Sequence, residues 1–490
     1  MAKRATVARI APNSSVAAAD RYDLVVVGSG PGGRRAAIQA AKLGRRVAVV
    51  EKGRRVGGVS VHTGTIPSKT MRETVLNLTG WRERGFYGRS YRVKDSITAN
   101  DLLHRLRHTL DHEVEIQEHQ FMRNHVDTVC GVARFSDAHT LDVQLADGSV
   151  RSLHGEKILL AVGTEPFRPG TIPFDGRSVI DSDELLSLDR IPSSLTVIGA
   201  GVIGVEYATI FSALDVRVTL IDPRTDVLNF VDHDIVQYLL HDLRERGVTL
   251  RLGHQVESVT RDAHDRCVCH LGGGRIVSSD MVLFCAGRMG ATRALDLHNA
   301  GLEVDHRNRL SVDEHYRTAV PHIYAVGDVI GFPSLASSSM EQGRVAASHA
   351  FDTTPAAPDK NFPYGIYAVP EISTVGMSEK DVAEREIPYE VGTARLRETA
   401  RGQIMGLNSG MMKLIFSIKT HRLLGAHIVG EGATELVHVA QAVMAHKGGL
   451  AYFLENTFNY PTLAEAYKVA ALDAWNRMPK KKAVGKKKAA

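Results

Sequence analysis

The sequence has 490 residues, of which 43% are hydrophobic and 23% are charged, with a formal net charge of +5. This length predicts about three globular domains, and the sequence contains neither an apolar run of the roughly 18–20 residues that span a membrane nor a secretory leader. The excess positive charge comes from six lysines at 480–482 and 486–488, which predict a solvated tail rather than a nucleic-acid-binding surface.

The first predicted element follows a flexible lead, residues 1–20, that has no apolar period. An apolar run at 24–27 predicts a parallel strand buried on both faces, and a helix is expected at 34–43. A second strand, 47–50, ends at Glu51 and completes a strand–helix–strand unit. Between the first strand and the helix, the glycines fit the pattern G-x-G-x-x-G at Gly28, Gly30 and Gly33.

This glycine pattern is typical of dinucleotide binding. Its glycines allow a tight turn, a close approach of the backbone to a pyrophosphate and close packing of helix on strand. The N-terminus of the helix offers N–H groups to the phosphates. Glu51 is placed to accept hydrogen bonds from an adenosine ribose.

The same unit recurs near the middle of the chain. A strand at 195–198, a helix at 205–214 and a strand at 216–221 enclose a second fingerprint and end at an acid. In both copies the acid follows the middle glycine by 21 residues, so we predict two dinucleotide-binding domains. The second fingerprint and its acid are Gly199, Gly201, Gly204 and Asp222.

The residues after the second copy leave the choice of nucleotide open. Asp222 favours NAD, because a carboxylate pairs with the ribose 2′-hydroxyl and repels a 2′-phosphate. Arg224 could instead pair with the 2′-phosphate of NADP, or it could be a solvated loop charge. Use of both nucleotides is therefore a hypothesis at this point.

The C-terminal part is expected to be an α+β module without a glycine fingerprint. Segments 412–416 and 423–429 predict antiparallel strands, and helices are expected at 433–446 and 462–475. His438, on the first of these helices, is interpreted as an interface or core histidine rather than as a ligand.

The cysteines indicate neither a metal site nor a disulfide framework. The chain has four, at 130, 267, 269 and 285, with no C-x-x-C pair and no cluster of His, Cys and carboxylates that would suggest a metal. Strand alternation would place Cys267 and Cys269 on one face. We interpret all four as reduced packing residues of a cytoplasmic protein.

Three further segments resemble motifs of the flavoprotein disulfide reductase family, and the resemblance covers 22–477. Residues 57–69 resemble its flavin segment G-G-x-C-x-x-x-x-C-x-P-S-K, 161–164 the crossing from sheet to linker, and 325–328 its second FAD motif. The implied fold is α/β, with two Rossmann-type domains, for FAD and NAD(P), and a C-terminal α+β dimerisation domain. The expected boundaries are 21–167 and 291–360 for FAD, 168–290 for NAD(P), 361–478 for dimerisation and 479–490 for a basic tail.

The resemblance also implies roles for particular residues. Lys69 and Glu206 would form an ion pair beside flavin N5, where a fixed cation stabilises charge on the reduced flavin. Asp328 would contact the ribityl chain, and the backbone at Leu335 and Ala336 would meet the flavin ring. The remaining cofactor contacts that it implies come from Lys52, Gly58, Val59, Ser60, Thr65, Ala133, Gly163, Arg288, Gly327 and Tyr460.

Departures from the family pattern narrow the expected chemistry. Ser60 and Thr65 occupy the two cysteine positions, and a hydroxyl cannot form a disulfide. Tyr460 stands where the family has a histidine that shuttles protons, although the frame with Glu465 remains. A phenol with an ordinary pKa of about 10 is a poor base at neutral pH, so dithiol chemistry is not expected.

Segments 65–69, 328–337, 365–367, 369–373 and 458–462 resemble the transhydrogenase members of the family, whereas Ser60 departs from those members that keep the first cysteine. The resemblance implies hydride transfer from NADPH to NAD⁺ by a ping-pong path through reduced flavin. It also implies a homodimer or higher homo-oligomer in which Tyr460 and Glu465 complete the partner subunit's site, with small nicotinamide substrates and no nucleic-acid or membrane partner. An NAD(P)H:quinone or dye reductase and a flavin-bearing assembly protein are the alternatives.

Overall fold

The computed structural model describes residues 20–88, 90–353 and 361–479. The chain divides into two compact units, each built from segments that are distant in sequence. The first unit takes in the described parts of Met1–Pro67, His108–Phe167 and Arg288–Pro358. The second takes in Ser68–Arg107, Arg168–Gly287 and Asp359–Ala490, again as far as they are described. The predicted N-terminal lead, apart from Asp20, and the lysine tail lie outside the described residues.

The first unit is built on a parallel sheet in the order β3-β2-β1-β5-β16. An antiparallel strand, β4, joins the edge strand β3 to the long strand β5. The bounds of these strands are Arg21–Val27 (β1), Val47–Glu51 (β2), Asp127–Phe135 (β3), Thr140–Leu145 (β4), Val150–Leu160 (β5) and Ile323–Ala325 (β16).

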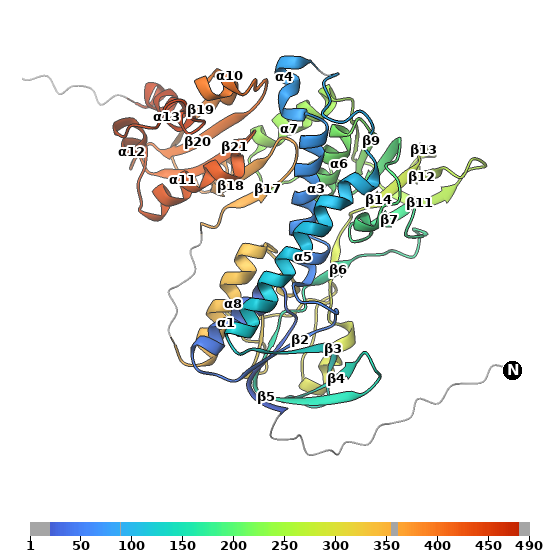
Figure 1. Ribbon diagram of the computed structural model, residues 1–490. Helices are drawn as coiled ribbons and strands as arrows, with labels where there is room; N and C mark the ends of the chain where they lie inside the picture. The colour runs from blue at the N-terminus through green and yellow to red at the C-terminus, as the bar shows by residue number, and fades with distance from the viewer. Residues whose placement is uncertain (1–19, 89, 354–360, 480–490) are drawn as a thin grey trace, which may run out of the picture. The chain divides into compact units, whose positions relative to one another are not determined.

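Strand β1 is buried on both faces, as its apolar run predicts. Leu24 and Val26 pack in one hydrophobic cluster and Val25 and Val27 in another, because successive side chains of a strand point to opposite faces. Helices α1 (Pro31–Lys42) and α8 (Ala336–Ala350) lie side by side against the first of these clusters (Figure 1).

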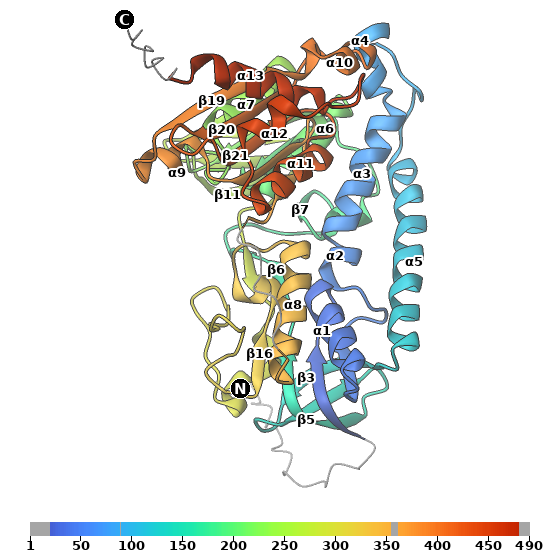
Figure 2. The same cartoon turned by 90° about the vertical axis from the view of Figure 1, so that its left-hand side faces the viewer.

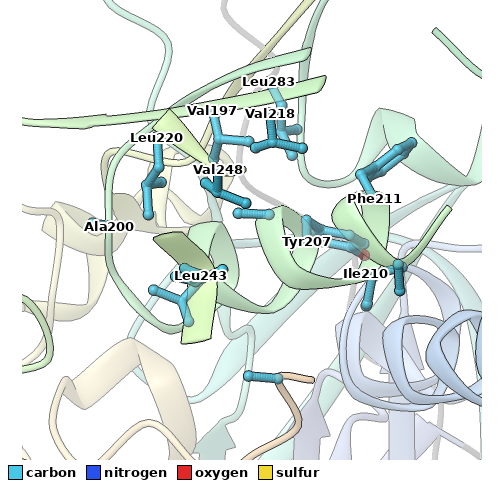
Figure 3. Packing of buried hydrophobic residues seen from close by; sticks show 14 of the residues in the cluster. Val197, Ala200, Tyr207, Ile210, Phe211, Val218, Leu220, Leu243, Val248 and Leu283 are labelled. Carbon is cyan, nitrogen blue, oxygen red and sulfur yellow. The ribbon is translucent and has the colours of Figure 1, made fainter. Parts of the chain in front are cut away.

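The second unit contains a parallel sheet in the order β10-β9-β8-β14-β7. Figure 3 shows Val197, Val218 and Leu283 of its strands close to Tyr207 and Phe211 of helix α6, in one apolar cluster. The bounds are Val179–Asp181 (β7), Ser194–Ile198 (β8), Arg217–Asp222 (β9), Thr249–Leu252 (β10), Met281–Phe284 (β14), Val202–Ala213 (α6) and His233–Glu245 (α7).

An antiparallel sheet, β11-β12-β13, also belongs to the second unit. Its bounds are Val256–Arg261, Cys267–Leu271 and Arg275–Ser279. Cys267 and Cys269 are both fully buried in one cluster, which confirms that they share a face of their strand. Burial raises the pKa of both thiols, that of Cys269 to about 12, so neither is a reactive thiolate at neutral pH.

The C-terminal residues form a separate antiparallel sheet of the second unit, in the order β17-β18-β21-β20-β19. Helices α11, α12 and α13 gather on one side of it (Figure 2). The bounds are Tyr364–Ile366 (β17), Ile372–Gly376 (β18), Tyr389–Arg395 (β19), Met411–Ser417 (β20), Leu423–Val429 (β21), Ala433–Ala445 (α11), Leu450–Glu455 (α12) and Glu465–Arg477 (α13).

Every strand and helix named from the sequence is present, with small shifts at the ends. Helix α1 starts at Pro31, three residues earlier than predicted. Proline is favoured at the first helical position, and the two glycines that follow it belong to the first helical turn. Helix α13 starts at Glu465 rather than at 462, because the residues before Glu465 form turns. Segments 412–416 and 423–429 pair antiparallel, as predicted.

Of the two places expected for His438, an interface or the core, the core is excluded and the interface stays a prediction. Val437 and Ala440 face the core of their cluster, and one residue further along a helix lies about 100° away, so His438 is exposed. Its Nδ1 lies 2.9 Å from Gln441 Oε1. No helix within residues 20–88, 90–353 and 361–479 is both long and apolar enough to cross a membrane.

Candidate active site

A pocket in the first unit lies at the carboxyl ends of β1 and β2, where doubly wound sheets bind their ligands. It brings together most of the residues predicted to hold FAD, although they come from five separate stretches of sequence. The predicted residues that line it are Gly28, Gly30, Glu51, Lys52, Gly58, Val59, Ser60, Thr65, Ala133, Gly163, Gly327, Asp328 and Ala336.

Other lining residues were missed by the sequence analysis. Ala291, Ala294 and Leu295 reach the pocket from a short helical turn and the residues before it, and Val132 comes from an edge strand. None of these residues belongs to a glycine fingerprint. Their place on the pocket wall is visible only in the folded first unit, where segments far apart in the sequence come together. Of the predicted set, Gly33, Leu335 and Arg288 belong to this unit but do not line the pocket.

The first glycine turn shows why each glycine is needed. A Cβ on Gly28, whose φ is +102°, would lie 2.4 Å from the Ala161 oxygen, and one on Gly33 would lie 1.9 Å from the Gly28 oxygen. A Cβ on Gly30 would meet nothing within 4 Å. Gly28 and Gly33 therefore serve close packing, whereas Gly30 leaves open space beside the pocket for a ligand.

Glu51 holds this turn in place. Its Oε2 accepts a hydrogen bond from the Ser29 N–H (3.1 Å) and another from the Ser29 hydroxyl, and its Oε1 accepts one from the Gly53 N–H (2.9 Å). The Ser29 hydroxyl in turn accepts from the Gly57 N–H (2.8 Å). A carboxylate has about four lone-pair positions, so Glu51 can still accept a ribose hydroxyl while it fixes the turn.

Asp328 is another ionisable residue of the pocket wall. Its burial raises its pKa above the ordinary value, and the charge of Arg288 partly opposes this shift. Arg288 is held behind the pocket by Thr164, to whose Oγ1 and carbonyl oxygen it donates, each at 2.9 Å. A partly buried carboxylate on the pocket wall suits a ligand that offers hydroxyl donors, such as the ribityl chain of FAD.

The positions of the family's disulfide are held by Ser60 and Thr65, which both line the pocket. Ser60 lies in helix α2 (Gly58–His62) and donates to the Gly57 carbonyl oxygen (3.2 Å), and Thr65 begins helix α3 (Thr65–Leu78). All four cysteines lie in the described part of the chain, where they are free and do not line the pocket.

The second glycine turn, in the second unit, repeats the geometry of the first. A Cβ on Gly204 would lie 1.8 Å from the Gly199 oxygen, and one on Gly201 would meet nothing within 4 Å. The Ala200 N–H donates to Asp222 Oδ2 (2.6 Å), as the Ser29 N–H does to Glu51. The same local sequence thus gives the same open turn in both units.

Arg224 forms a bidentate ion pair with Asp222. Its Nε lies 2.9 Å from Asp222 Oδ1 and its Nη2 2.9 Å from Oδ2. Burial favours the neutral form of Asp222, but the hydrogen bonds from Arg224 and Ala200 outweigh it and lower the Asp222 pKa. The side chain of Arg224 is 55% exposed, and its Nη1 is not used by Asp222.

Lys69 and Glu206 form the predicted ion pair within the second unit. Lys69 Nζ lies 2.9 Å from Glu206 Oε1 and 2.8 Å from Oε2. The side chain of Glu206 is 4% exposed and that of Lys69 is 26% exposed. Because a buried carboxylate needs a partner, Glu206 fixes the ammonium group at this place.

Glu465 begins α13 and Tyr460 lies in the turns before it, and the two side chains differ in exposure. Tyr460 is 72% exposed, whereas Glu465 Oε2 is buried and has no hydrogen-bond partner among the residues that the structure describes. A buried carboxylate oxygen without a partner is unusual in a complete site.

These features define a nucleotide-dependent oxidoreductase with a Rossmann-type fold. Comparison with known proteins identifies its family. The family model "Pyridine nucleotide-disulphide oxidoreductase" matches residues 22–348, and the dimerisation domain of the same family matches 362–471. The chain belongs to this family. Its fold is the mixed α/β fold of the family, with FAD and NAD(P) as cofactors.

Among its relatives, a "Soluble pyridine nucleotide transhydrogenase" of Mycobacterium tuberculosis (strain ATCC 25177 / H37Ra) is 51% identical over 93% of this chain and 98% of the relative. A protein of the same name from Colwellia psychrerythraea is 42% identical over the same shares. The solved structure of LpdA from Mycobacterium tuberculosis is similar, with a TM-score of 0.84 and 26% identity over 92% of this chain and 99% of that one.

The glycine turn of the first unit can be tested with two alanine variants. In Gly33→Ala the new Cβ collides with the Gly28 carbonyl oxygen, so unfolding should become easier by about 1–3 kcal/mol. In Gly30→Ala the Cβ finds open space, so the protein should melt like wild type once FAD is removed but retain much less FAD. The ratio of flavin to protein and denaturant unfolding measure both effects, and equal flavin retention in Gly30→Ala and wild type would contradict this account.

Asp328→Asn should affect stability and cofactor binding in opposite directions. Since burial raises the pKa of Asp328, its ionisation makes the flavin-free protein less stable as pH rises through the folded-state pKa, and asparagine removes that pH dependence. FAD affinity should fall roughly tenfold or more, because a hydrogen bond to a charged group is lost. Unfolding of flavin-free protein between acid and neutral pH, with FAD titration, tests both effects; unchanged FAD affinity would remove Asp328 from the site.

Proposed function

We propose that the protein transfers hydride between NADPH and NAD⁺, without a redox-active disulfide. Hydroxyls at Ser60 and Thr65, on the pocket wall where the family places its two cysteines, are the observation that carries the proposal. The names of its relatives support it, since they are 42–51% identical to the chain over nearly their full length. When bound, FAD supplies the group that accepts hydride from one nicotinamide and passes it to the other.

The proposal assigns residues 21–167 and 291–360 to FAD, 168–290 to NAD(P) and 361–478 to dimerisation. The sequence of the second unit carries one glycine fingerprint, Gly199 to Gly204. We propose that the two nicotinamide nucleotides use this site in turn, which makes the reaction ping-pong. The free cysteines fit a reducing compartment such as the cytoplasm.

In this mechanism the residues of the chain bind and orient FAD and the nicotinamide nucleotides. Hydride transfer itself needs no protein base. The open turn at Gly30 leaves room for the pyrophosphate of FAD, and Glu51 accepts from its ribose. Lys69 follows Thr65 by one turn of α3, and the mechanism assigns it the fixed positive charge beside the flavin. Glu206 holds that charge in position.

The dimerisation domain makes the site depend on a second subunit in this proposal. The partner subunit would supply groups to the region of Tyr460 and Glu465, and those two residues would complete the partner's site. The buried Glu465 oxygen, which has no partner in the described part of its own chain, supports this arrangement. Substrates are small nicotinamide nucleotides.

The decisive experiment mixes the purified protein with NADPH and thionicotinamide adenine dinucleotide, an NAD⁺ analogue with its own absorbance, in the absence of oxygen. Rapid reduction of the analogue that requires FAD is expected. The flavin-free protein is the control. If NADPH reduces the flavin but the analogue stays oxidised, the function is not transhydrogenation, and turnover with a quinone would then favour a reductase. Failure of both nucleotides to reduce the flavin would favour an assembly role.

The Asp222–Arg224 pair provides a second test, on nucleotide choice. We propose that Asp222 holds the guanidinium so that its free Nη1 faces a 2′-phosphate. Arg224→Ala should raise the KM for NADPH roughly tenfold or more and change that for NADH little, because a charge-assisted bond contributes about 1.5–3 kcal/mol.

The variant Asp222→Asn distinguishes two possible roles of the acid, because they predict opposite changes in the affinity for a 2′-phosphate. If Asp222 positions Arg224, this variant binds adenosine 2′,5′-bisphosphate more weakly than wild type does. If its carboxylate repels the 2′-phosphate instead, the variant binds that ligand more tightly. Calorimetric titration, with 5′-AMP as the matched ligand lacking the phosphate, measures the difference without turnover.

A further inference from the structure

Tyr367 lies against the ion pair of Lys69 and Glu206 and was given no role by the sequence analysis. It follows strand β17 directly, and its N–H donates to Glu206 Oε1 (2.8 Å). Its ring lies under the ammonium group, with Lys69 Nζ 4.9 Å from the ring centroid. One residue thus contacts both members of the pair, the anion through its backbone and the cation through its ring.

The ammonium group of Lys69 has already used its hydrogen-bond donors. Its three N–H groups are matched by three acceptors, the two Glu206 oxygens and the Ser68 hydroxyl at 3.2 Å. An aromatic face attracts a cation without taking an N–H, so the Tyr367 ring can stabilise the charge where no further donor is free.

The ring is itself held firmly. The Tyr367 hydroxyl is in hydrogen-bond contact with Thr434, whose hydroxyl donates to Glu371 (2.8 Å). Glu371 pairs with the buried Arg72 at 3.2 Å. Burial raises the pKa of Tyr367, so the phenol stays neutral at working pH and presents a ring rather than a phenolate.

We propose that Tyr367 is a positioning residue that fixes the place and the charge of Lys69 for hydride transfer. The inference rests on the proposed role of Lys69 beside the flavin. Tyr367 would act through Lys69, whichever molecule finally accepts the hydride.

The test compares Tyr367→Leu with the matched variant Tyr367→Phe, which keeps the ring and the backbone N–H and loses only the hydroxyl. Reduction of the bound flavin by NADPH, followed by stopped flow without oxygen, should slow about fivefold in Tyr367→Leu and less than twofold in Tyr367→Phe. A cation–π contact of about 1 kcal/mol corresponds to this ratio. Flavin content and circular dichroism show that both variants are folded and loaded.

A structural role alone would give a different result in the Lys69→Met background. If Tyr367 acts through Lys69, adding Tyr367→Leu to Lys69→Met should change the reduction rate by less than twofold. A fivefold loss that persists in this background would overturn the proposal, and so would a wild-type rate in Tyr367→Leu. This half-reaction needs only NADPH and flavin, so a failure to reduce an NAD⁺ analogue does not affect it.

A second readout needs no turnover. Loss of the ring should leave Lys69 more accessible to an amine-reactive reagent, so that mass spectrometry finds faster modification of Lys69 in Tyr367→Leu than in wild type or Tyr367→Phe. Equal rates in all three proteins would show that the ring does not shield the ammonium group, and would overturn the proposal.

Discussion

The closeness of helix to strand at the two glycine turns is the constraint on which the nucleotide sites depend. Gly33 and Gly204 each face a carbonyl oxygen at a distance that leaves no room for a side chain. This contact seats the N-terminus of the helix over the end of its strand, so that the free N–H groups and the positive end of the helix dipole face the ligand. A buried acid, Glu51 or Asp222, then locks each turn through a backbone N–H.

In the second unit, buried charged side chains connect segments that are far apart in the sequence. Lys413 of β20 is fully buried and is bonded to Asp232 (2.9 Å), Asp234 (2.7 Å) and Glu379 (2.6 Å). These bonds raise the pKa of Lys413 against the effect of burial. The Lys69–Glu206 pair follows the same principle, since each buried charge has opposite charges and hydrogen bonds around it. Such a pair can keep a charge in a fixed place, which suits a catalyst that works by electrostatics.

The hydroxyl residues Ser60 and Thr65, at the two cysteine positions of the family, are accommodated in the family's fold. The flavin segment with Ser60 and Thr65 still folds into two helices beside the pocket, because its glycines and its P-S-K residues set the local backbone. The buried Cys267 and Cys269 have raised pKa values and cannot replace the missing thiols. Fold and cofactors are those of the family, and the proposal of hydride transfer without a disulfide rests on the hydroxyls at these two positions.

The sequence by itself determined the features that depend on short-range spacing. The alternation in β1, the two glycine turns, the acids at the strand ends and the antiparallel pair near the C-terminus could all be predicted, because backbone sterics and burial act over a few residues. The resemblance to a family supplied most of the pocket wall. Tertiary structure decided the rest: the ion pair that Arg224 makes, the reach of Ala291 to Leu295 into the pocket, and the exposure of His438. Tyr367 meets Lys69 and Glu206 only because strand β17 ends beside helices α3 and α6 in the folded second unit, and no local pattern records a contact between residues so far apart in the chain.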